Sequence, residues 1–168
     1  LSESMRSMAA DIRVLRQVMA GPWLVQSFRP STQNIAVPAV MLAGDIIQLV
    51  PTIKEPGSIL FASVTVSART ATFNAILDNS LQVFPLDSLT IGEFTEPHFP
   101  GVWLTQADDA NGLYTAVFNP GDIIGAPFFS SFAFFVQNVG TPTILLHDFF
   151  VRVKQFRPLS EFTKLTEE

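Results

Sequence analysis

The sequence predicts an all-β protein, an antiparallel β-sandwich or jelly roll that is preceded by a short N-terminal α-helix. Three observations support this prediction. Residues 58–156 alternate between apolar and polar side chains, with turn residues at intervals of about ten residues. No helical pattern of ten residues separates these runs, which argues against a parallel α/β sheet. The first twenty residues alone carry apolar side chains at helical spacing.

The composition favours a folded chain that buries much of its surface. Of the 168 residues, 48% are hydrophobic and 15% are charged, against about 25% charged in an average soluble protein. The chain contains 16 Phe, one Tyr and no Cys, and its net charge is -5. Disorder, a disulfide framework and Cys-based zinc sites are therefore excluded. Nucleic-acid binding is not expected, because phosphate neutralisation requires clustered Lys and Arg.

Residues 1–21 are expected to form a helix that joins subunits as a coiled-coil stem. Its apolar residues alternate at spacings of four and three: Leu1, Met5, Met8, Ile12, Leu15 and Met19. This spacing is that of the a and d positions of a coiled coil, and it places Met5, Met8, Ile12, Leu15 and Met19 at an oligomer interface. Gly21-Pro22 is a helix stop signal. The alternative is an amphipathic helix that lies on the sheet of its own domain.

Residues 22–57 are interpreted as a connecting segment with edge strands. Two apolar stretches, 35–43 and 45–53, each contain a proline, and proline confines a strand to a sheet edge or a strand end. Pro56-Gly57 is a turn signal, and the apolar periodicity changes after it.

Residues 58–156 form the predicted β-sandwich domain. Together with the connecting segment, we expect roughly eight to ten short strands. The clearest runs are 58–66, 71–77, 81–84, 102–105, 113–118, 132–139 and 145–154. In the last run, the odd-numbered residues from Leu145 to Val153 are expected to share one apolar face, which makes His147 a core or interface histidine. Asp108 to Gly112 ends in Asn-Gly, the dipeptide typical of a hairpin.

The remaining segments predict neither a membrane span nor a removable leader. The best apolar run, residues 35–50, is interrupted by Pro38, Gly44, Asp45 and Gln48. The first twenty residues carry charges and contain no continuous apolar region, so no signal peptide is expected. Residues 157–168 are interpreted as a polar tail that is either frayed or draped on a neighbour.

Residues for catalysis are scarce, and we expect neither an enzyme nor a bound cofactor. The chain has two His and no Cys, and it lacks a nucleophile elbow, a P-loop and a dinucleotide fingerprint. Glu93, Glu96 and His98 could form a small cluster, but nearby prolines indicate a loop, and a metal requires more convergent ligands. No metal site is therefore predicted.

The charges are distributed unevenly along the chain. No Lys or Arg occurs from Thr70 to Val151, whereas eight acids do. We interpret most of these acids as solvated turn residues, the alternatives being cation binding or the docking of a basic partner. Asp108, Asp109 and Asn111 resemble the start of a calcium loop, but their spacing does not fit an EF-hand.

Adjacent phenylalanines in two late strands indicate a subunit interface. Phe134 precedes Phe135 and Phe149 precedes Phe150, and neighbours in a strand point to opposite faces of the sheet. One member of each pair therefore faces away from the core, and exposed apolar clusters mark interfaces. We expect Phe135 and Phe150 to contact another subunit.

Trp103 and Tyr114 suggest a competing function, carbohydrate binding by a lectin-like module. Each side chain pairs an apolar ring with a polar group, as stacking on a sugar requires. A position of Trp103 in the core is the simpler interpretation. These two residues are the candidate ligand site.

A helical segment that leads into a charge-poor, Phe-rich β-domain resembles bacteriophage and viral structural proteins such as head fibres, spikes, tail-fibre tips and jelly-roll capsid proteins. Residues 57–66 open the domain in a similar manner, and residues 134–139 and 149–153 close it. The resemblance implies a non-enzymatic component of the virion that is often trimeric. It also implies as partners copies of the chain, other virion proteins and a glycan on a host surface.

Overall fold

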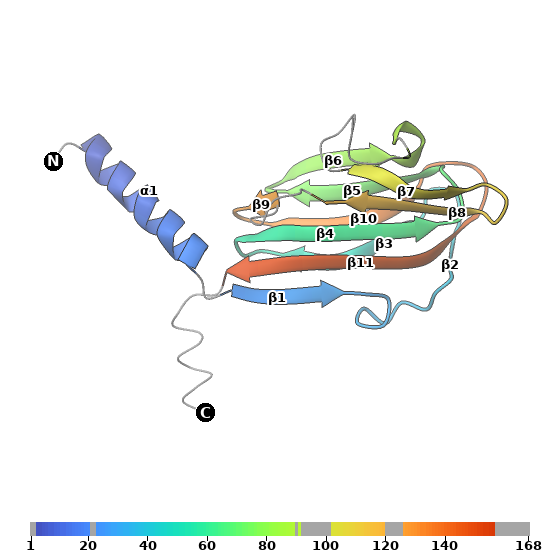
Figure 1. Ribbon diagram of the computed structural model, residues 1–168, viewed down its shortest axis with the longest axis horizontal. Coiled ribbons are helices and arrows are strands. Elements are labelled where there is room, and N and C mark those ends of the chain that lie inside the picture. Colours follow the sequence, from blue (N-terminus) through green and yellow to red (C-terminus); the bar gives the residue numbers. More distant parts are fainter. Residues whose placement is uncertain (1–2, 21–22, 90, 92–101, 120–125, 157–168) are drawn as a thin grey trace, which may run out of the picture.

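The computed structural model describes residues 3–20, 23–89, 91, 102–119 and 126–156, and two antiparallel sheets dominate it (Figure 1). The prediction of an all-β protein with one N-terminal helix is confirmed. The elements are α1 (Glu3–Ala20), β1 (Trp23–Phe28), β2 (Ala39–Met41), β3 (Ile46–Ile53), β4 (Gly57–Val66), β5 (Ala71–Leu77), β6 (Ser80–Pro85), the 3-10 helix η1 (Leu86–Ser88), β7 (Val102–Asp108), β8 (Leu113–Phe118), β9 (Ala126–Phe128), β10 (Phe132–Asn138) and β11 (Ile144–Phe156).

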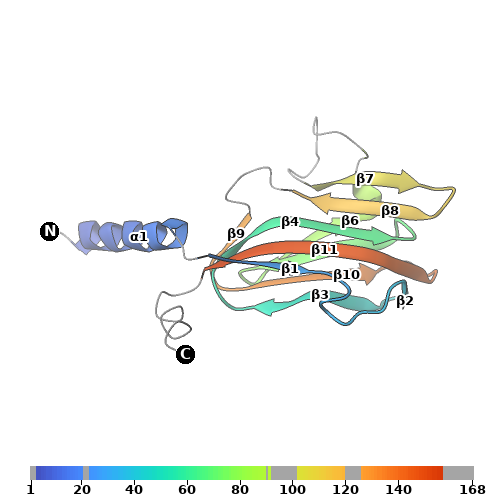
Figure 2. The same ribbon diagram turned by 60° about the horizontal axis from the view of Figure 1, so that its bottom comes forward.

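The two sheets interleave strands from distant parts of the chain. The seven-stranded sheet has the order β1-β11-β4-β8-β7, with β2 also paired to β11 and β9 also paired to β4. The four-stranded sheet has the order β3-β10-β5-β6. Figure 2 shows the two sheets one behind the other, with α1 leaving the end at which β1 begins and β11 finishes.

Both sheets contribute to one hydrophobic core. Val64 of β4 and Val151 of β11 come from the seven-stranded sheet, and Phe73 of β5 and Phe134 of β10 come from the four-stranded sheet. The rings of Phe73 and Phe134 meet edge to face with centroids 4.2 Å apart. Alternate residues of each strand supply this core, which is the period-2 pattern that the sequence predicts.

The segment interpreted as a connection supplies three of the strands. Strand β1 pairs with β11 from Trp23 opposite Phe156 to Phe28 opposite Val151, and β2 pairs with the other half of β11. Strand β3 pairs with β10 and is an edge strand, as its proline predicts. The sheets therefore begin at Trp23, and residues 22–57 contribute strands to both of them.

The predicted apolar face of the last strand is wrong in its first half. Ile144 and Leu146 are buried, and the buried set then changes parity to Phe149, Val151 and Val153. The cause is an irregularity in the pairing with β4 between Leu146 and Asp148, which inserts one residue into β11. His147 lies at this irregularity and is half-buried rather than part of the apolar face.

Gly57 opens β4 and is constrained by a close approach. A Cβ atom at this position would lie 2.6 Å from the Lys154 carbonyl oxygen and 2.6 Å from a ring carbon of Phe128. Gly57 pairs with Phe128 on one side and with Gln155 on the other. A side chain here would therefore separate β9 and β11 from β4.

Two hairpin turns join neighbouring strands, and the one predicted at Asp108 to Gly112 is confirmed. Asp78 and Asn79 have φ angles of 52° and 66°, and Leu77 pairs with Ser80 across this two-residue turn between β5 and β6. Gly112 has a φ angle of 62° in the turn between β7 and β8. These left-handed backbone conformations are those that Asn, Asp and Gly tolerate best.

Asn138 at the end of β10 connects two loops in the interior. Its side chain is completely buried, and Nδ2 donates to the carbonyl oxygens of Met41 at 3.1 Å and Pro142 at 2.8 Å. Its Oδ1 accepts from the Gly140 amide at 3.1 Å. The Asn138 side chain therefore joins the loop before β3 to the loop before β11.

We expect Asn138→Ala to lower the free energy of unfolding by about 2–3 kcal/mol, because two carbonyls and one amide lose a partner in a buried site. Urea denaturation of the wild type and the variant measures this difference. Gln137→Ala is the control, since the neighbouring side chain is only half-buried, and a change within about 0.5 kcal/mol is expected. Equal losses for the two variants would contradict the role of Asn138.

Candidate assembly surfaces

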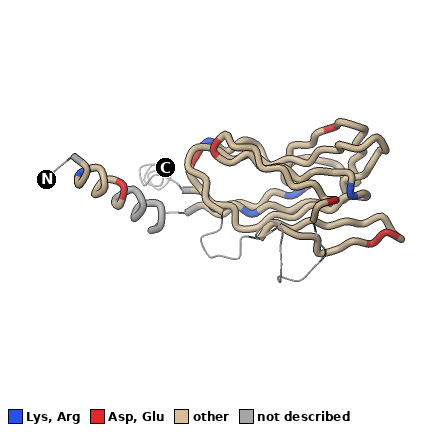
Figure 3. Tube along the Cα trace, turned by 90° about the horizontal axis from the view of Figure 1, so that it is seen from above, with Lys and Arg blue, Asp and Glu red and all other residues tan. Residues whose placement is uncertain are grey.

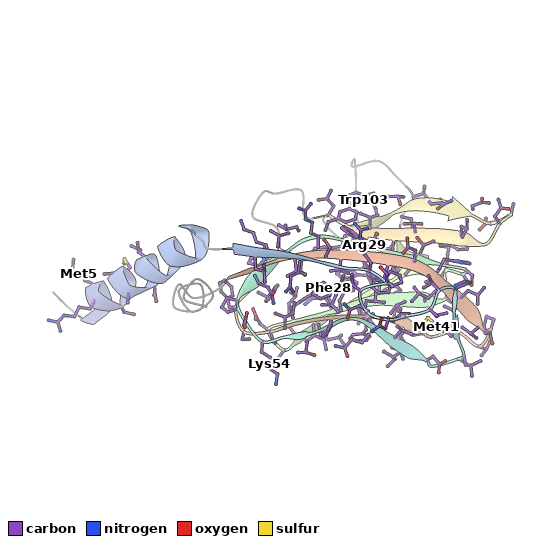
Figure 4. The ribbon with its side chains drawn as sticks, turned by 90° about the horizontal axis from the view of Figure 1, so that it is seen from below. Met5, Phe28, Arg29, Met41, Lys54 and Trp103 are labelled. Atoms are coloured by element: carbon purple, nitrogen blue, oxygen red, sulfur yellow. The ribbon has the colours of Figure 1, made fainter. Side chains whose placement is uncertain are left out.

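The apolar seam of α1 is exposed. Met5, Met8 and Ile12 are 56%, 62% and 47% exposed, and every described side chain from Ser4 to Ile12 is exposed as well. Figure 4 shows Met5 on a helix that stands apart from the sheets. The alternative in which the helix lies on its own sheet is therefore not observed. Leu15 and Met19 belong to α1, but their side chains lie outside the described residues.

We call the four-stranded sheet simply sheet B, and its surface that points away from the core the outer B face. Phe135 lies on this face. Phe134 is buried, whereas Phe135 is half-buried and points the other way. Cross-strand partners place Gln48, Phe135, Asn74 and Val83 in one row across this face. Its members are Ile46, Gln48, Thr72, Asn74, Ile76, Leu81, Val83, Pro85, Ala133, Phe135 and Gln137, none of which carries a charge.

Strand β6 is the exposed rim of the outer B face, and the sequence did not single it out. Leu81 and Val83 are 55% and 43% exposed and project from the same side of the strand. A signal was present, because Leu81 and Val83 alternate with Ser80 and Gln82 in a segment without Lys or Arg. The alternation predicted the strand but could not distinguish an apolar face in the core from one in solvent.

Phe150 faces away from the core, as predicted, but its own chain partly covers it. Its ring lies 6.0 Å from that of Phe61, and the guanidinium of Arg29 lies 5.0 Å above it. A cation over an aromatic face contributes about 0.5–1 kcal/mol at an exposed site. Phe150 therefore has an intramolecular role, in contrast to the exposed side chains of β6.

The two candidate ligand residues do not share a face. Trp103 lies between the buried residues Val102 and Leu104, so its half-buried ring points away from the core (Figure 4). Tyr114 instead packs against the core, and its hydroxyl donates a hydrogen bond to Asp109. This bond to a carboxylate raises the pKa of Tyr114. A stacking platform that uses both rings is not formed, and carbohydrate binding remains a prediction.

The described acids act mainly as acceptors for their own backbone. Asp108 accepts from the Asn111 side chain at 2.7 Å and from the Asn111 amide at 3.1 Å, and these bonds lower the pKa of Asp108. Among the described residues, no three His, Asp or Glu side chains are grouped to hold a metal ion. Glu93, Glu96 and His98, for which no metal site is predicted, lie outside the described residues, as does the tail 157–168.

Asp78 joins the β5–β6 turn to the loop between β9 and β10. Its carboxylate accepts from the amides of Phe129, Ser130 and Ser131 at 2.7–3.2 Å and from the Ser130 hydroxyl at 3.0 Å. The hydrogen bond from the Ser130 amide is the main cause of the lowered pKa of Asp78. The carboxylate thus fixes the end of the four-stranded sheet at which β6 begins.

Arg69 holds the other end of β6. Its Nη2 donates to the carbonyl oxygens of Leu86 and Leu89 at 3.2 and 2.9 Å, and to that of Asp87 at 3.3 Å. These carbonyls belong to η1 and the residue after it, and the Leu86 oxygen also accepts from the Leu89 amide at 3.2 Å. The Arg69 guanidinium therefore holds the segment that follows β6. Figure 3 shows that charged residues are sparse along the described sheets.

No family model matches the chain, and no curated protein is similar to it. Within the described part of the chain, α1 does not have the apolar content that a membrane-crossing helix requires.

We expect Asp78→Asn to lower the free energy of unfolding at pH 7 by about 1 kcal/mol. The neutral amide oxygen accepts weaker hydrogen bonds than the carboxylate, and exposure of the site to solvent reduces the size of this loss. The lowered pKa of Asp78 means that this contribution is complete above the ordinary carboxyl pKa of about 3.9 and is lost as pH falls through the folded value. The difference between wild type and variant should therefore shrink below pH 4, as followed by urea denaturation from pH 7 to pH 3.

Asp87→Asn is the control for this experiment. The Asp87 side chain is 72% exposed, and its oxygen lies 3.9 Å from Arg69 Nε. A surface pair of this kind contributes little. If both variants lose the same stability, or if the Asp78 difference is constant with pH, the role given to Asp78 is wrong.

Proposed function

We propose that the chain is a non-enzymatic structural protein that assembles with copies of itself through α1 and presents a jelly-roll domain at the end of the resulting stem. The observation that carries the proposal is the exposed seam of Met5, Met8 and Ile12 on a helix that stands apart from the sheets. A single helix of this length is marginally stable in water unless its apolar side is covered. Helices from other copies supply that cover most directly.

The sheet order supports the jelly roll as the finer fold class. If β1, β3, β4, β5, β6, β8, β10 and β11 are numbered one to eight, one sheet has the order 1-8-3-6 and the other 2-7-4-5. This order results when a long hairpin of eight strands is rolled up as two Greek keys, the arrangement of many viral capsid and lectin domains. Strands β2, β7 and β9 are additions to it.

A virion is the setting that the resemblance to phage and viral structural proteins suggests. The supporting features are those of assembly rather than of chemistry: an exposed helical seam and an uncharged outer B face that includes Phe135. A trimer is the proposed state, with other virion proteins as further partners.

Replacement of Met8 and Ile12 together by Glu tests the stem. We expect the wild type at low micromolar concentration to have three times the chain mass of 18.5 kDa in light scattering, and the Met8→Glu/Ile12→Glu protein to be monomeric. The reason is that buried glutamates in the seam are desolvated and repel one another.

Ala10→Glu is the matched control, because it adds the same charge to an exposed position of α1 outside the spacing of four and three. It should keep the wild-type mass. A monomeric wild type, or an unchanged mass in the double variant, would refute assembly through α1.

A further inference from the structure

We propose that strand β6 pairs with β6 of a second copy of the chain, antiparallel and about a two-fold axis. Strand β6 ends the four-stranded sheet, and within the described part of the chain β5 is the strand that it pairs with. Proteins usually protect such an edge with Lys, other charges or a bulge. The sequence of β6, Ser-Leu-Gln-Val-Phe-Pro, carries no charge, and its pairing with β5 is regular.

The hairpin geometry determines which backbone groups face the open edge. Leu77 and Ser80 flank the two-residue turn and form a hydrogen-bonded pair, and such pairs alternate along an antiparallel ladder. Ser80, Gln82 and Phe84 therefore direct their N–H and C=O groups to β5. Leu81 and Val83 direct theirs to the open edge. Pro85 stands at the next position that faces the open edge, so its missing N–H removes no hydrogen bond between β6 and β5.

One register satisfies these groups best. If Gln82 lies opposite Gln82 of the second copy, Leu81 lies opposite Val83 and Val83 opposite Leu81. Each of these two pairs exchanges both of its main-chain hydrogen bonds. If both strands shift by one residue so that Val83 lies opposite Val83, Leu81 lies opposite Pro85, which lacks an N–H. If they shift the other way so that Leu81 lies opposite Leu81, Val83 has no regular strand residue opposite it. The edge is thus complementary to itself in the way that a two-fold axis requires.

Side chains and charge favour a second copy as the occupant. In this register Leu81 and Val83 of both copies, which are 55% and 43% exposed in one chain, form one apolar cluster. Copies of a chain with a net charge of -5 repel each other over most of their surface, but the strand and the outer B face behind it carry no charge. Among the described residues next to β6 in the sequence, the acids Asp78 and Asp87 stand beyond the ends of the strand.

Asp78 and Arg69 prepare the edge for this contact. The Asp78 carboxylate holds the loop that precedes β10 through three backbone amides, and Arg69 holds η1 through three backbone carbonyls. Both ends of β6 are therefore fixed before a second strand arrives, which reduces the entropy lost on pairing.

The pairing rests on the proposed function in one respect, because a two-fold contact cannot close within a three-fold stem and so joins one stem oligomer to another. The two ideas fail separately. The stem determines the mass at low concentration, whereas the β6 contact determines whether that mass doubles as concentration rises.

A single cysteine tests the register, because the chain has no cysteine of its own. In Gln82→Cys, the two sulfur-bearing residues face each other at a non-hydrogen-bonded pair, where the Cα distance of about 4.5 Å falls within disulfide range. We expect a dimer band on a non-reducing gel that dithiothreitol removes. Ser80→Cys is the matched control on the same strand, since Ser80 lies opposite Phe84 of the second copy and should give little dimer. Equal dimer yields for both variants, or no dimer from Gln82→Cys, would overturn the pairing.

Sedimentation velocity from low micromolar to about 0.5 mM tests the contact in the full chain without cross-linking. The wild-type mass should rise toward twice its low-concentration value, and Leu81→Lys/Val83→Lys should abolish the rise while leaving the stem oligomer and the thermal unfolding temperature essentially unchanged. Ile46→Lys adds a charge to an equally exposed residue at the other edge of the outer B face, and it should behave as the wild type. Doubling that persists in the β6 variant, or its absence in the wild type, would refute the proposal.

Discussion

The pairing of β11 with strands from the first third of the chain is the constraint on which the rest of the structure depends. Strand β11 lies between β1 and β4, so the chain must fold back almost its full length before the seven-stranded sheet is complete. Without cysteines, backbone ladders and the shared core must stabilise these distant contacts. A chain with such non-local pairing is expected to fold slowly, because the entropy of loop closure is lost before the distant strands make stabilising contacts. The pairing of β11 also fixes β1, the strand that follows α1.

Alternation of apolar and polar residues was sufficient to predict most strands, because one face of each strand faces the core. It failed where a position depends on a partner strand. The irregularity near His147 shifts the parity of β11, and nothing in the local sequence distinguishes it from regular alternation. The role of β1 was missed for the same reason, since its register is set by residues 151–156. The apolar seam of α1 could be predicted from spacing, but its exposure could not, because a helix that lies on its own sheet has the same spacing. The exposure of Leu81 and Val83 likewise required the strand order.

The shortage of Lys and Arg between Thr70 and Val151 has a structural explanation. Three of the described acids there bind backbone amides: Asp78 those of the loop before β10, Asp108 that of Asn111 and Asp148 that of Phe149. Asp109 accepts from the Tyr114 hydroxyl, and Asp87 lies 3.9 Å from Arg69, which also binds carbonyl oxygens. Charge is thus used at turns and strand ends, which leaves the outer B face neutral. A neutral face weakens the repulsion between copies that the net charge would otherwise impose.

The two proposed contacts differ in symmetry, and this difference determines what an assembly can become. A helical stem joins copies around one axis and stops when its apolar seam is covered. An edge contact about a two-fold axis joins exactly one further copy through each free β6, so it extends an assembly only if the stem already holds several edges together. Each contact alone is small and therefore weak, but a stem that presents several edges raises their effective concentration toward a neighbouring stem. A protein with both contacts can join two stem oligomers into one larger assembly from one kind of chain, whereas the loss of the β6 contact leaves the stem oligomer alone.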